Sequence, residues 1–94
     1  MSEAALTRRI LAFLRSQPHT WAVKIHGSQW QAAGTPDILA CVSGRFLAIE
    51  VKTPKGVVSP LQAHVIERIS NAGGKAAVVR SVEEVHDMLY AIDR

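Results

Sequence analysis

The sequence predicts a mixed α/β fold whose helices and strands follow one another in the order α-β-β-β-α-β-α. Two β-rich runs, residues 38–42 and 45–51, flank the dipeptide Ser43-Gly44, which suits a tight hairpin turn because glycine accepts positive φ. Three segments, one near each end and one after residue 59, repeat apolar residues at helical spacing. The short apolar run 75–79 follows a helical crossover and should join the sheet as a parallel strand. Helices should cover this mixed sheet.

Length and composition predict one small domain spanning residues 1–94. The 94 residues are 48% hydrophobic but only 5% aromatic, which indicates a compact core of alanine and branched aliphatic side chains. The net charge of +3 and the pI near 9.5 favour polyanionic partners. This balance is too modest to establish nucleic-acid binding by itself.

The sequence does not predict export or membrane insertion. No apolar run approaches the ~18 residues of a membrane span, and the N-terminus lacks the pattern of a signal peptide. The single cysteine, Cys41, lies in an apolar strand and cannot form an intramolecular disulfide, so its predicted role is packing in a reducing compartment. We therefore expect a soluble intracellular protein of the cytoplasm, in a bacterial or phage-type host cell, with no membrane partner.

The first predicted helix covers residues 2–17, with Ser2 as its N-cap and Pro18 as its stop. Its expected apolar face comprises Leu6, Ile10, Phe13 and Leu14. The polar sector carries Arg8, Arg9 and Arg15. Solvation is a simpler role for these arginines than contact with phosphates. Glu3 lies in the first turn, where the helix dipole favours a negative side chain.

The next predicted strand, residues 21–26, alternates between two faces. Trp21, Val23 and Ile25 share one face, and Ala22, Lys24 and His26 share the other. We expect the second face to look toward the functional site, where Lys24 and His26 could contact substrate phosphate. For His26 an ordinary surface role is the simpler alternative. In the polar loop 27–35, Trp30 could stack on an unpaired base or cap the core.

The Ser43-Gly44 turn determines the register expected for the hairpin. Counting back from it places Ile38 opposite Ile49 and Asp37 opposite Glu50 at the open end. The remaining predicted pairs are Val42 with Arg45, Cys41 with Phe46, Ala40 with Leu47 and Leu39 with Ala48. Directly opposed Cβ atoms lie roughly 4.5–5.5 Å apart, where like charges are destabilising. A positive group must therefore neutralise the two opposed acids.

Asp37, Glu50 and Lys52 together have the composition of a metal-dependent hydrolytic site. Alternation puts Glu50 and Lys52 on one strand face, and paired carboxylates bind hard divalent cations such as Mg²⁺. A neighbouring lysine can orient or deprotonate a water, or stabilise charge that develops on phosphorus. The alternative is a surface ion pair between Glu50 and Lys52, with Asp37 merely ending a loop. The apolar run 46–51 favours metal-assisted hydrolysis, because a carboxylate in a buried strand needs a partner.

A loop and a capped helix should follow the hairpin. Thr53-Pro54-Lys55-Gly56 ends the strand, and Lys55 is a predicted phosphate contact near the site. Ser59 and Pro60 are typical of the N-cap and first position of a helix. Gln62 lies in the first turn of that helix, beside N–H groups that can bind an anion. The expected apolar side comprises Leu61, Val65, Ile66 and Ile69.

The C-terminal part should supply one strand and one structural helix. Residues 71–74 end the preceding helix, and residues 75–79 form the strand. Ser81-Val82-Glu83-Glu84 has the pattern of a capping box that opens the last helix. The residues expected to face inward from it are Val82, Val85, Leu89 and Ile92.

Three of these motifs resemble a known family. Gly34-Thr35-Pro36-Asp37, Glu50-Val51-Lys52 and Ser59-Pro60-Leu61-Gln62 match, in order and spacing, the VRR-NUC (virus-type replication-repair nuclease) branch of the PD-(D/E)XK nuclease superfamily. The similarity covers the chain from about the first helix to the last strand. It implies a restriction-endonuclease-like fold, in which helices flank a mixed β-sheet.

The resemblance also implies a Mg²⁺- or Mn²⁺-dependent DNA endonuclease. The implied metal ligands are Asp37, Glu50 and the backbone carbonyl of Val51, and the implied catalytic residues are Asp37, Glu50, Lys52 and Gln62. In many nucleases of the superfamily an acidic residue of the first helix reaches the metal. Glu3 is the only acid in the predicted first helix, so it is either a further ligand or a compensating charge for the helix dipole.

A standalone domain of this kind resembles junction-resolving nucleases, which act as symmetric dimers. The resemblance therefore implies a homodimer that acts on branched, flapped or Holliday-junction DNA in replication, repair or recombination. The alternative is a catalytically inactive module of the same fold that binds nucleic acid or a partner protein. The intact set of Asp37, Glu50 and Lys52 favours the enzyme, because a binding module has no need of opposed carboxylates. No segment supplies the recognition domain of a sequence-specific restriction enzyme.

Overall fold

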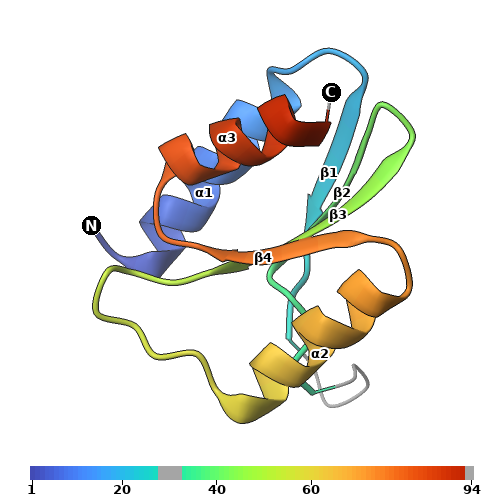
Figure 1. Ribbon diagram of the computed structural model, residues 1–94. Helices are drawn as coiled ribbons and strands as arrows, with labels where there is room; N and C mark the ends of the chain where they lie inside the picture. Colours follow the sequence, from blue (N-terminus) through green and yellow to red (C-terminus); the bar gives the residue numbers. More distant parts are fainter. Residues whose placement is uncertain (28–32, 93–94) are drawn as a thin grey trace.

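The computed structural model describes residues 1–27 and 33–92 and confirms the predicted order of elements (Figure 1). The three helices are α1 (Glu3–Arg15), α2 (Pro60–Asn71) and α3 (Val82–Ile92), and the four strands are β1 (Thr20–Lys24), β2 (Ile38–Val42), β3 (Arg45–Val51) and β4 (Lys75–Val79). None of the helices in the described part of the chain has the length and apolar character that a membrane crossing requires.

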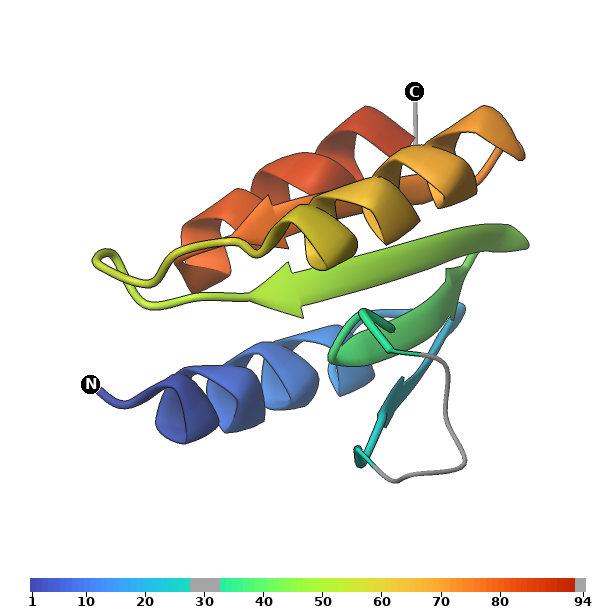
Figure 2. The same ribbon diagram turned by 90° about the horizontal axis from the view of Figure 1, so that it is seen from below.

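The four strands form one mixed sheet in the order β1-β2-β3-β4. The β1–β2 and β2–β3 pairs are antiparallel, and β3 pairs with β4 in parallel, as the helical crossover predicts. In Figure 1, α1 and α3 lie above β4 and α2 lies below it, so the sheet separates one helix from the other two. Figure 2 shows α2 in front of the sheet and α1 on the other side of β3.

The hairpin between β2 and β3 has the predicted turn and the predicted register. Ser43 and Gly44 both have positive φ, at 50° and 83°, which is the backbone of a two-residue hairpin turn that matches the strand twist. The pairs run from Val42 with Arg45 to Ile38 with Ile49. The register places Asp37 and Glu50 together just beyond the last backbone pair.

The main core lies between the sheet and the pair α1 and α3. Its buried members are Leu6, Ile10, Leu11, Leu14, Ala22, Ile38, Ala40, Val42, Leu47, Ile49, Val51, Val79, Val85, Met88 and Leu89. Leu47, Ile49 and Val51 are fully buried, so alternate residues of β3 point into this core. Glu50 and Lys52 therefore leave the strand on the other face, which is the face that α2 partly covers.

The structure corrects which face of β1 enters the core. The sequence suggested that Ala22 and Lys24 look toward the functional site, but Ala22 is buried in the core and pairs with Ala40. Lys24 pairs with Ile38, so it also leaves the sheet on the core face, opposite Glu50. Trp21 lies on the α2 side and is 64% exposed. A small alanine fits against α1, whereas the large indole does not.

Three smaller expectations were wrong in detail. The Ser81 hydroxyl accepts from the Glu84 N–H as predicted, but the Glu84 carboxylate accepts from the Arg80 N–H instead of closing a full capping box. Cys41 is exposed because it pairs with Trp21 on the half-covered face, so it does not pack in the core. The first helix ends at Arg15 rather than Gln17, where the backbone turns.

Candidate metal-dependent nuclease site

Asp37 lies at the open end of the hairpin. Its carboxylate Oδ2 accepts a hydrogen bond of 2.8 Å from the backbone N–H of Val51, and its carbonyl accepts one of 2.7 Å from the N–H of Ile25. The backbone pairs of β2 with β3 end at Ile38 and Ile49, so the Asp37 side chain continues the pairing by one step. These two bonds fix Asp37 between the ends of β1 and β3.

Glu50 is a buried acid in contact with Asp37. Only 2% of Glu50 is exposed. The pKa of Glu50 is raised to about 8, chiefly by burial and then by the hydrogen bond with Asp37 and the negative charge of Asp37, while the charge of Lys52 acts to lower it. The raised pKa of Glu50 favours its protonated form at neutral pH in the ion-free protein. A bound divalent cation would take the place of this proton.

Lys52 is half-buried, and its neighbours hold it beside the two acids. Its N–H donates to the Val79 carbonyl at 3.0 Å, which extends the pairing of β3 with β4. Gly56 passes so close to the Lys52 stem that an added Cβ would lie 3.3 Å from the Lys52 Cδ. The positive charge of Lys52 acts to lower the pKa of Glu50.

Arg80 holds the loop that follows Lys52, a role that the sequence interpretation missed. One guanidinium nitrogen, Nη1, lies 2.6 Å from the Thr53 carbonyl, 2.8 Å from the Gly56 carbonyl and 3.3 Å from the Pro54 carbonyl. The loop carries the exposed Lys55. In the sequence, the only signal of this role was that Arg80 follows the strand expected beside β3. This position does not reveal which carbonyls Arg80 would contact.

Gln62 takes part in the cap of α2. Its side-chain Oε1 accepts from the Ser59 N–H at 2.9 Å, and its own N–H donates to the Ser59 hydroxyl at 3.1 Å. This reciprocal pair is a capping box. The catalytic role of Gln62 stays a prediction. In that role the amide NH₂ would face the substrate, because the Oε1 accepts from the Ser59 N–H.

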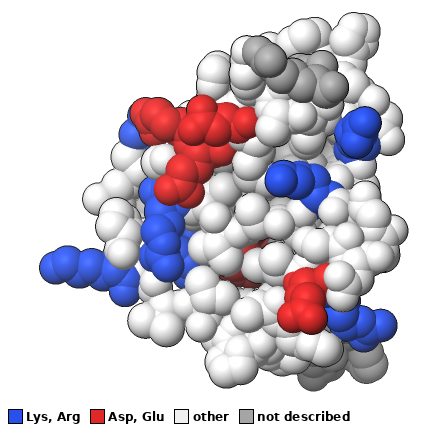
Figure 3. Space-filling view, in the orientation of Figure 1, with Lys and Arg blue, Asp and Glu red and all other residues white. Residues whose placement is uncertain are grey.

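The residues expected to contact nucleic acid are spread around the molecule. The Lys24 ammonium group donates to the Ile25 carbonyl at 2.7 Å. His26 is exposed just beyond β1, and Lys55 is exposed in the loop that Arg80 holds. Trp30 lies outside the described residues. In Figure 3, basic side chains are scattered over the visible face and acidic ones gather over α3, so this view shows no continuous basic surface.

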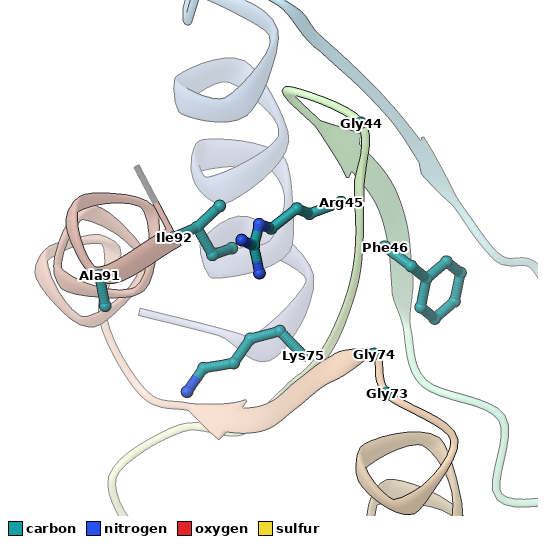
Figure 4. A pocket seen from close by; sticks show the side chains of 8 residues that line it. All are labelled: Gly44, Arg45, Phe46, Gly73, Gly74, Lys75, Ala91 and Ile92. Atoms are coloured by element: carbon teal, nitrogen blue, oxygen red, sulfur yellow. The ribbon is translucent and has the colours of Figure 1, made fainter. Parts of the chain in front are cut away.

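A separate cavity of about 400 Å³ lies at the other end of β3, between β3, β4 and the end of α3. Figure 4 shows the side chains of Arg45 and Lys75 directed into it. Arg45 precedes Glu50 by five residues, which at ~3.3 Å per residue is roughly 17 Å along the strand. This cavity is therefore not part of the Asp37 and Glu50 site.

The donor set fits a hard divalent cation. Asp37 and Glu50 supply carboxylate oxygens, and the predicted Val51 carbonyl would add a third oxygen ligand. Within residues 1–27 and 33–92 no three His, Cys, Asp or Glu side chains form a metal-binding group. Glu3 raises the pKa of Glu50 slightly through its charge, so it lies within electrostatic reach without completing such a group. Two carboxylates suit Mg²⁺, because Mg²⁺ retains several waters.

The comparison with protein families agrees with this geometry. The family model of the VRR-NUC domain matches residues 2–83, which include Asp37, Glu50, Lys52 and the cap of α2. The chain belongs to the VRR-NUC domain family. This result confirms the resemblance noted in the sequence, and VRR-NUC is a nuclease-domain family.

Solved structures similar to this VRR-NUC domain share its fold. A structure described as a VRR-NUC domain has a TM-score of 0.76 at 21% identity and covers 94% of each chain. A VRR-NUC domain protein has a TM-score of 0.73 at 18% identity, covering 99% of this chain and 86% of its own. Hjc of Archaeoglobus fulgidus, a Holliday junction resolvase, has a TM-score of 0.62 at 24% identity, with coverage of 83% and 67%. No curated protein sequence matches this VRR-NUC chain.

Proposed function

We propose that this VRR-NUC domain, spanning residues 1–94, is a Mg²⁺- or Mn²⁺-dependent endonuclease that hydrolyses phosphodiester bonds of DNA. The observation that carries the proposal is the contact between Asp37 and the buried Glu50, with Lys52 beside them. A buried Glu50 in contact with a second acid is costly unless a proton or a cation neutralises the pair. Membership of a nuclease-domain family supports a catalytic role for these two acids.

Each residue of the site has a proposed role. Asp37, Glu50 and the Val51 carbonyl hold the ion, and Glu3 is a further candidate ligand. The bound ion would stabilise negative charge on the phosphoryl oxygens and lower the pKa of a bound water. Lys52 orients or deprotonates the attacking water, or stabilises charge on phosphorus, and Gln62 positions the substrate through its amide. The water adds to phosphorus as the bond to the leaving oxygen breaks.

The substrate we propose is branched DNA, such as a flap or a Holliday junction, met during replication, repair or recombination inside the cell. The likeness of the fold to that of the Holliday junction resolvase Hjc supports this choice. Lys24, His26, Trp30 and Lys55 are the proposed DNA contacts. The domain has few side chains that could read bases in a groove, which favours recognition of shape over sequence. We further propose that the protein acts as a homodimer, whose two sites would serve two strands.

A cleavage assay on defined substrates tests the proposal. Purified protein is incubated with linear duplex, single-stranded, flapped and four-way-junction DNA in Mg²⁺, Mn²⁺ or chelator. We expect metal-dependent cutting, with preference for branched substrates, that Asp37→Asn abolishes and Lys52→Ala slows strongly. Cutting at full rate by either variant would remove the proposed mechanism. Binding without cutting in any metal would favour the module that only binds DNA.

A further inference from the structure

The cavity between β3, β4 and the end of α3 receives two basic side chains from neighbouring strands. Arg45 belongs to the alternating row of β3 residues that continues into the core with Leu47. Lys75 pairs with Leu47, so it lies on the same face of the sheet. Both basic side chains are exposed, and Figure 4 shows both directed into the cavity beside Ala91 and Ile92. A row of core-facing positions therefore ends in two positive charges.

The described residues supply no acid to balance these charges. Of the described residues that line the cavity, only Arg45 and Lys75 are charged. The acids of α3, Glu83, Glu84 and Asp87, lie at least one turn before the last residue of that helix. Neither Arg45 nor Lys75 has an ion pair or a side-chain hydrogen bond within residues 1–27 and 33–92. The cavity thus holds two cations without a described partner.

These two cations repel each other unless an anion lies between them. Adjacent strands are roughly 4.8 Å apart, and Arg45 is offset from the partner of Lys75 by two residues, or roughly 6.7 Å. The two Cα atoms are therefore about 8 Å apart, which is about one Debye length at physiological ionic strength. Salt screens this repulsion only in part. An anion in the cavity would attract both side chains, so the arrangement favours an anionic ligand.

The two kinds of cation suit a phosphate monoester better than a carboxylate. The planar guanidinium of Arg45 can donate two parallel hydrogen bonds, which already occupy both oxygens of a carboxylate. A phosphate monoester has three terminal oxygens and a charge of about −1.5 to −2 at neutral pH. It can therefore accept from the Arg45 fork and still present an oxygen to the Lys75 ammonium group.

The cavity has room for more than the phosphate itself. Its volume of about 400 Å³ falls within the range of about 300–1,000 Å³ that is typical of small-molecule sites. Ala91 and Ile92 supply apolar lining on the α3 side. Gly44 and Gly73 have positive φ, and a Cβ added at either would meet nothing within 4 Å, so bare backbone faces open space there. The cavity therefore suits a phosphate that carries an organic group.

We propose that this cavity binds the phosphate monoester of a nucleotide, with the phosphate between Arg45 and Lys75 and the organic part against Ile92. The nucleotide is either free or the phosphorylated end of a DNA strand, because both present the same phosphate group. Arg45 and Glu50 are five positions apart on β3, so the cavity and the proposed metal site lie toward opposite ends of the strand and on opposite faces of the sheet. The inference goes beyond the proposed function and does not depend on it.

Titration of the intact ¹⁵N-labelled protein, followed by nuclear magnetic resonance, tests the proposal. The probe is deoxyadenosine monophosphate, added in chelator at constant ionic strength, and deoxyadenosine is the matched compound without phosphate. We expect the monophosphate to give saturable shifts centred on the amides of Gly44, Gly73 and Ile92. Deoxyadenosine should give none at the same concentrations, because it offers the two cations no charge.

A charge-matched pair of variants locates the binding. The double variant Arg45→Gln, Lys75→Gln should bind the monophosphate at least tenfold more weakly, because one lost charge-assisted hydrogen bond accounts for a factor of that size. The control Arg8→Gln, Arg68→Gln removes the same charge from exposed positions on α1 and α2 and should bind like the wild type. The spectrum of each unbound variant verifies that it is folded.

Two oligonucleotides distinguish the sources of the phosphate. A short single strand is added in chelator, once with a 5′-phosphate and once without it. Saturable binding of the phosphorylated strand and of the monophosphate means that the cavity accepts both sources. Binding of the monophosphate alone restricts it to free nucleotides, and binding of the phosphorylated strand alone restricts it to DNA ends. Equal binding of the strand without the 5′-phosphate would overturn the assignment to a monoester.

The remaining outcomes separate this cavity from the nuclease. Shifts that spread over the surface without saturation, or equal affinities of the two double variants, would overturn the proposed phosphate site. Asp37→Asn should bind the monophosphate like the wild type, because Asp37 lies at the other end of the hairpin. Phosphate binding by a protein that cuts no DNA in any metal would support the cavity and count against the nuclease. DNA cutting without phosphate binding would do the reverse.

Discussion

The carboxylate of Asp37 accepts a hydrogen bond from the N–H of Val51, the residue directly after Glu50. One aspartate therefore serves both the strand pairing and the proposed metal site. The two roles predict different results for two substitutions. Asparagine keeps an oxygen that can accept from the Val51 N–H, whereas alanine keeps none.

We predict that Asp37→Asn loses metal binding with little change in stability, while Asp37→Ala loses both. Leaving the Val51 N–H without its partner should cost about 1–3 kcal/mol of unfolding free energy. Urea unfolding of the two variants, together with calorimetric titration of Mg²⁺ and Mn²⁺, measures both quantities. Equal stabilities for the two variants would mean that the hydrogen bond contributes nothing to the fold.

Metal affinity should rise with pH because of Glu50. Its pKa of about 8 means that an ion must displace a proton at neutral pH. One released proton makes the apparent affinity rise about tenfold per pH unit below pH 8 and level off above it. Calorimetry in buffers of different ionisation enthalpy counts the released protons. Binding that shows no proton release at pH 7 would contradict the protonated state of Glu50.

The same pKa predicts how the stability of the ion-free protein depends on pH. Folding raises the pKa of Glu50 from 4.5 to about 8. Below about pH 4.5 Glu50 is protonated in both the folded and the unfolded state, so its ionisation does not change the free energy of unfolding. As pH rises from there to about 8, only the unfolded state releases the proton, and the Glu50 contribution lowers stability. Denaturation of Glu50→Gln in chelator should lack this decline, and an identical pH profile would contradict it.

Lys52→Ala should slow cleavage without preventing metal binding. A positioned proton-transfer or charge-stabilising group contributes about 10²–10⁴-fold to rate, so the loss should fall in that range. Single-turnover cleavage of junction DNA measures the rate, and titration with Mn²⁺ measures binding. The matched control is Lys55→Ala, an exposed lysine three residues away, which should weaken DNA binding more than it slows the cleavage step. Similar rate losses in both variants would deny Lys52 a specific role.

Arg80→Gln should loosen the loop after Lys52. The variant removes charged hydrogen bonds to the carbonyls of Thr53 and Gly56, and we expect it to lose about 2 kcal/mol of stability. Trypsin cleavage after Lys55 should accelerate because the loop opens more often. An exposed cation off the loop, Arg68, supplies the control Arg68→Gln. Unchanged cleavage after Lys55 would show that Arg80 does not restrain the loop.

Gly34→Ala, three residues before Asp37, should lower the stability of the protein more than Gly44→Ala in the hairpin turn does. Both glycines have φ of +83°, so each substitution carries a strain of about 1–2 kcal/mol. An added Cβ at Gly34 would also lie 2.9 Å from the Leu61 Cγ and 3.0 Å from the Leu61 carbonyl, whereas at Gly44 it meets nothing within 4 Å. Thermal unfolding compares the pair directly. Equal losses would mean that α2 shifts freely to make room.

The hairpin and its acids could be predicted from local chemistry. The Ser43-Gly44 turn permits positive φ at both positions, and counting residues from it places Asp37 beside Glu50. The capping signals of Ser2 and Ser59 also act within a few residues, and both helices begin where these signals predict. Information of this kind is contained in adjacent residues, so the sequence alone was enough.

The errors arose where distant elements decide the outcome. Alternation in β1 separates Trp21 from Ala22, but only the positions of α1 and α2 determine which of the two faces is buried. The three carbonyls that Arg80 contacts lie 24 to 27 residues before it. Whether Glu50 is surface-exposed or buried likewise depends on β4 and on the helices. A single sequence does not specify these long-range contacts.

Strand β3 has a consequence for synthesis of the protein on the ribosome. Residues 50 and 52 leave the exit tunnel well before β4, yet the Lys52 N–H pairs with Val79 and the following loop is held by Arg80. The arrangement of Lys52 and its loop therefore cannot form until β4 and Arg80 have emerged. A nascent polypeptide stalled before that point would lack the complete proposed site, so translation would delay any activity that depends on it.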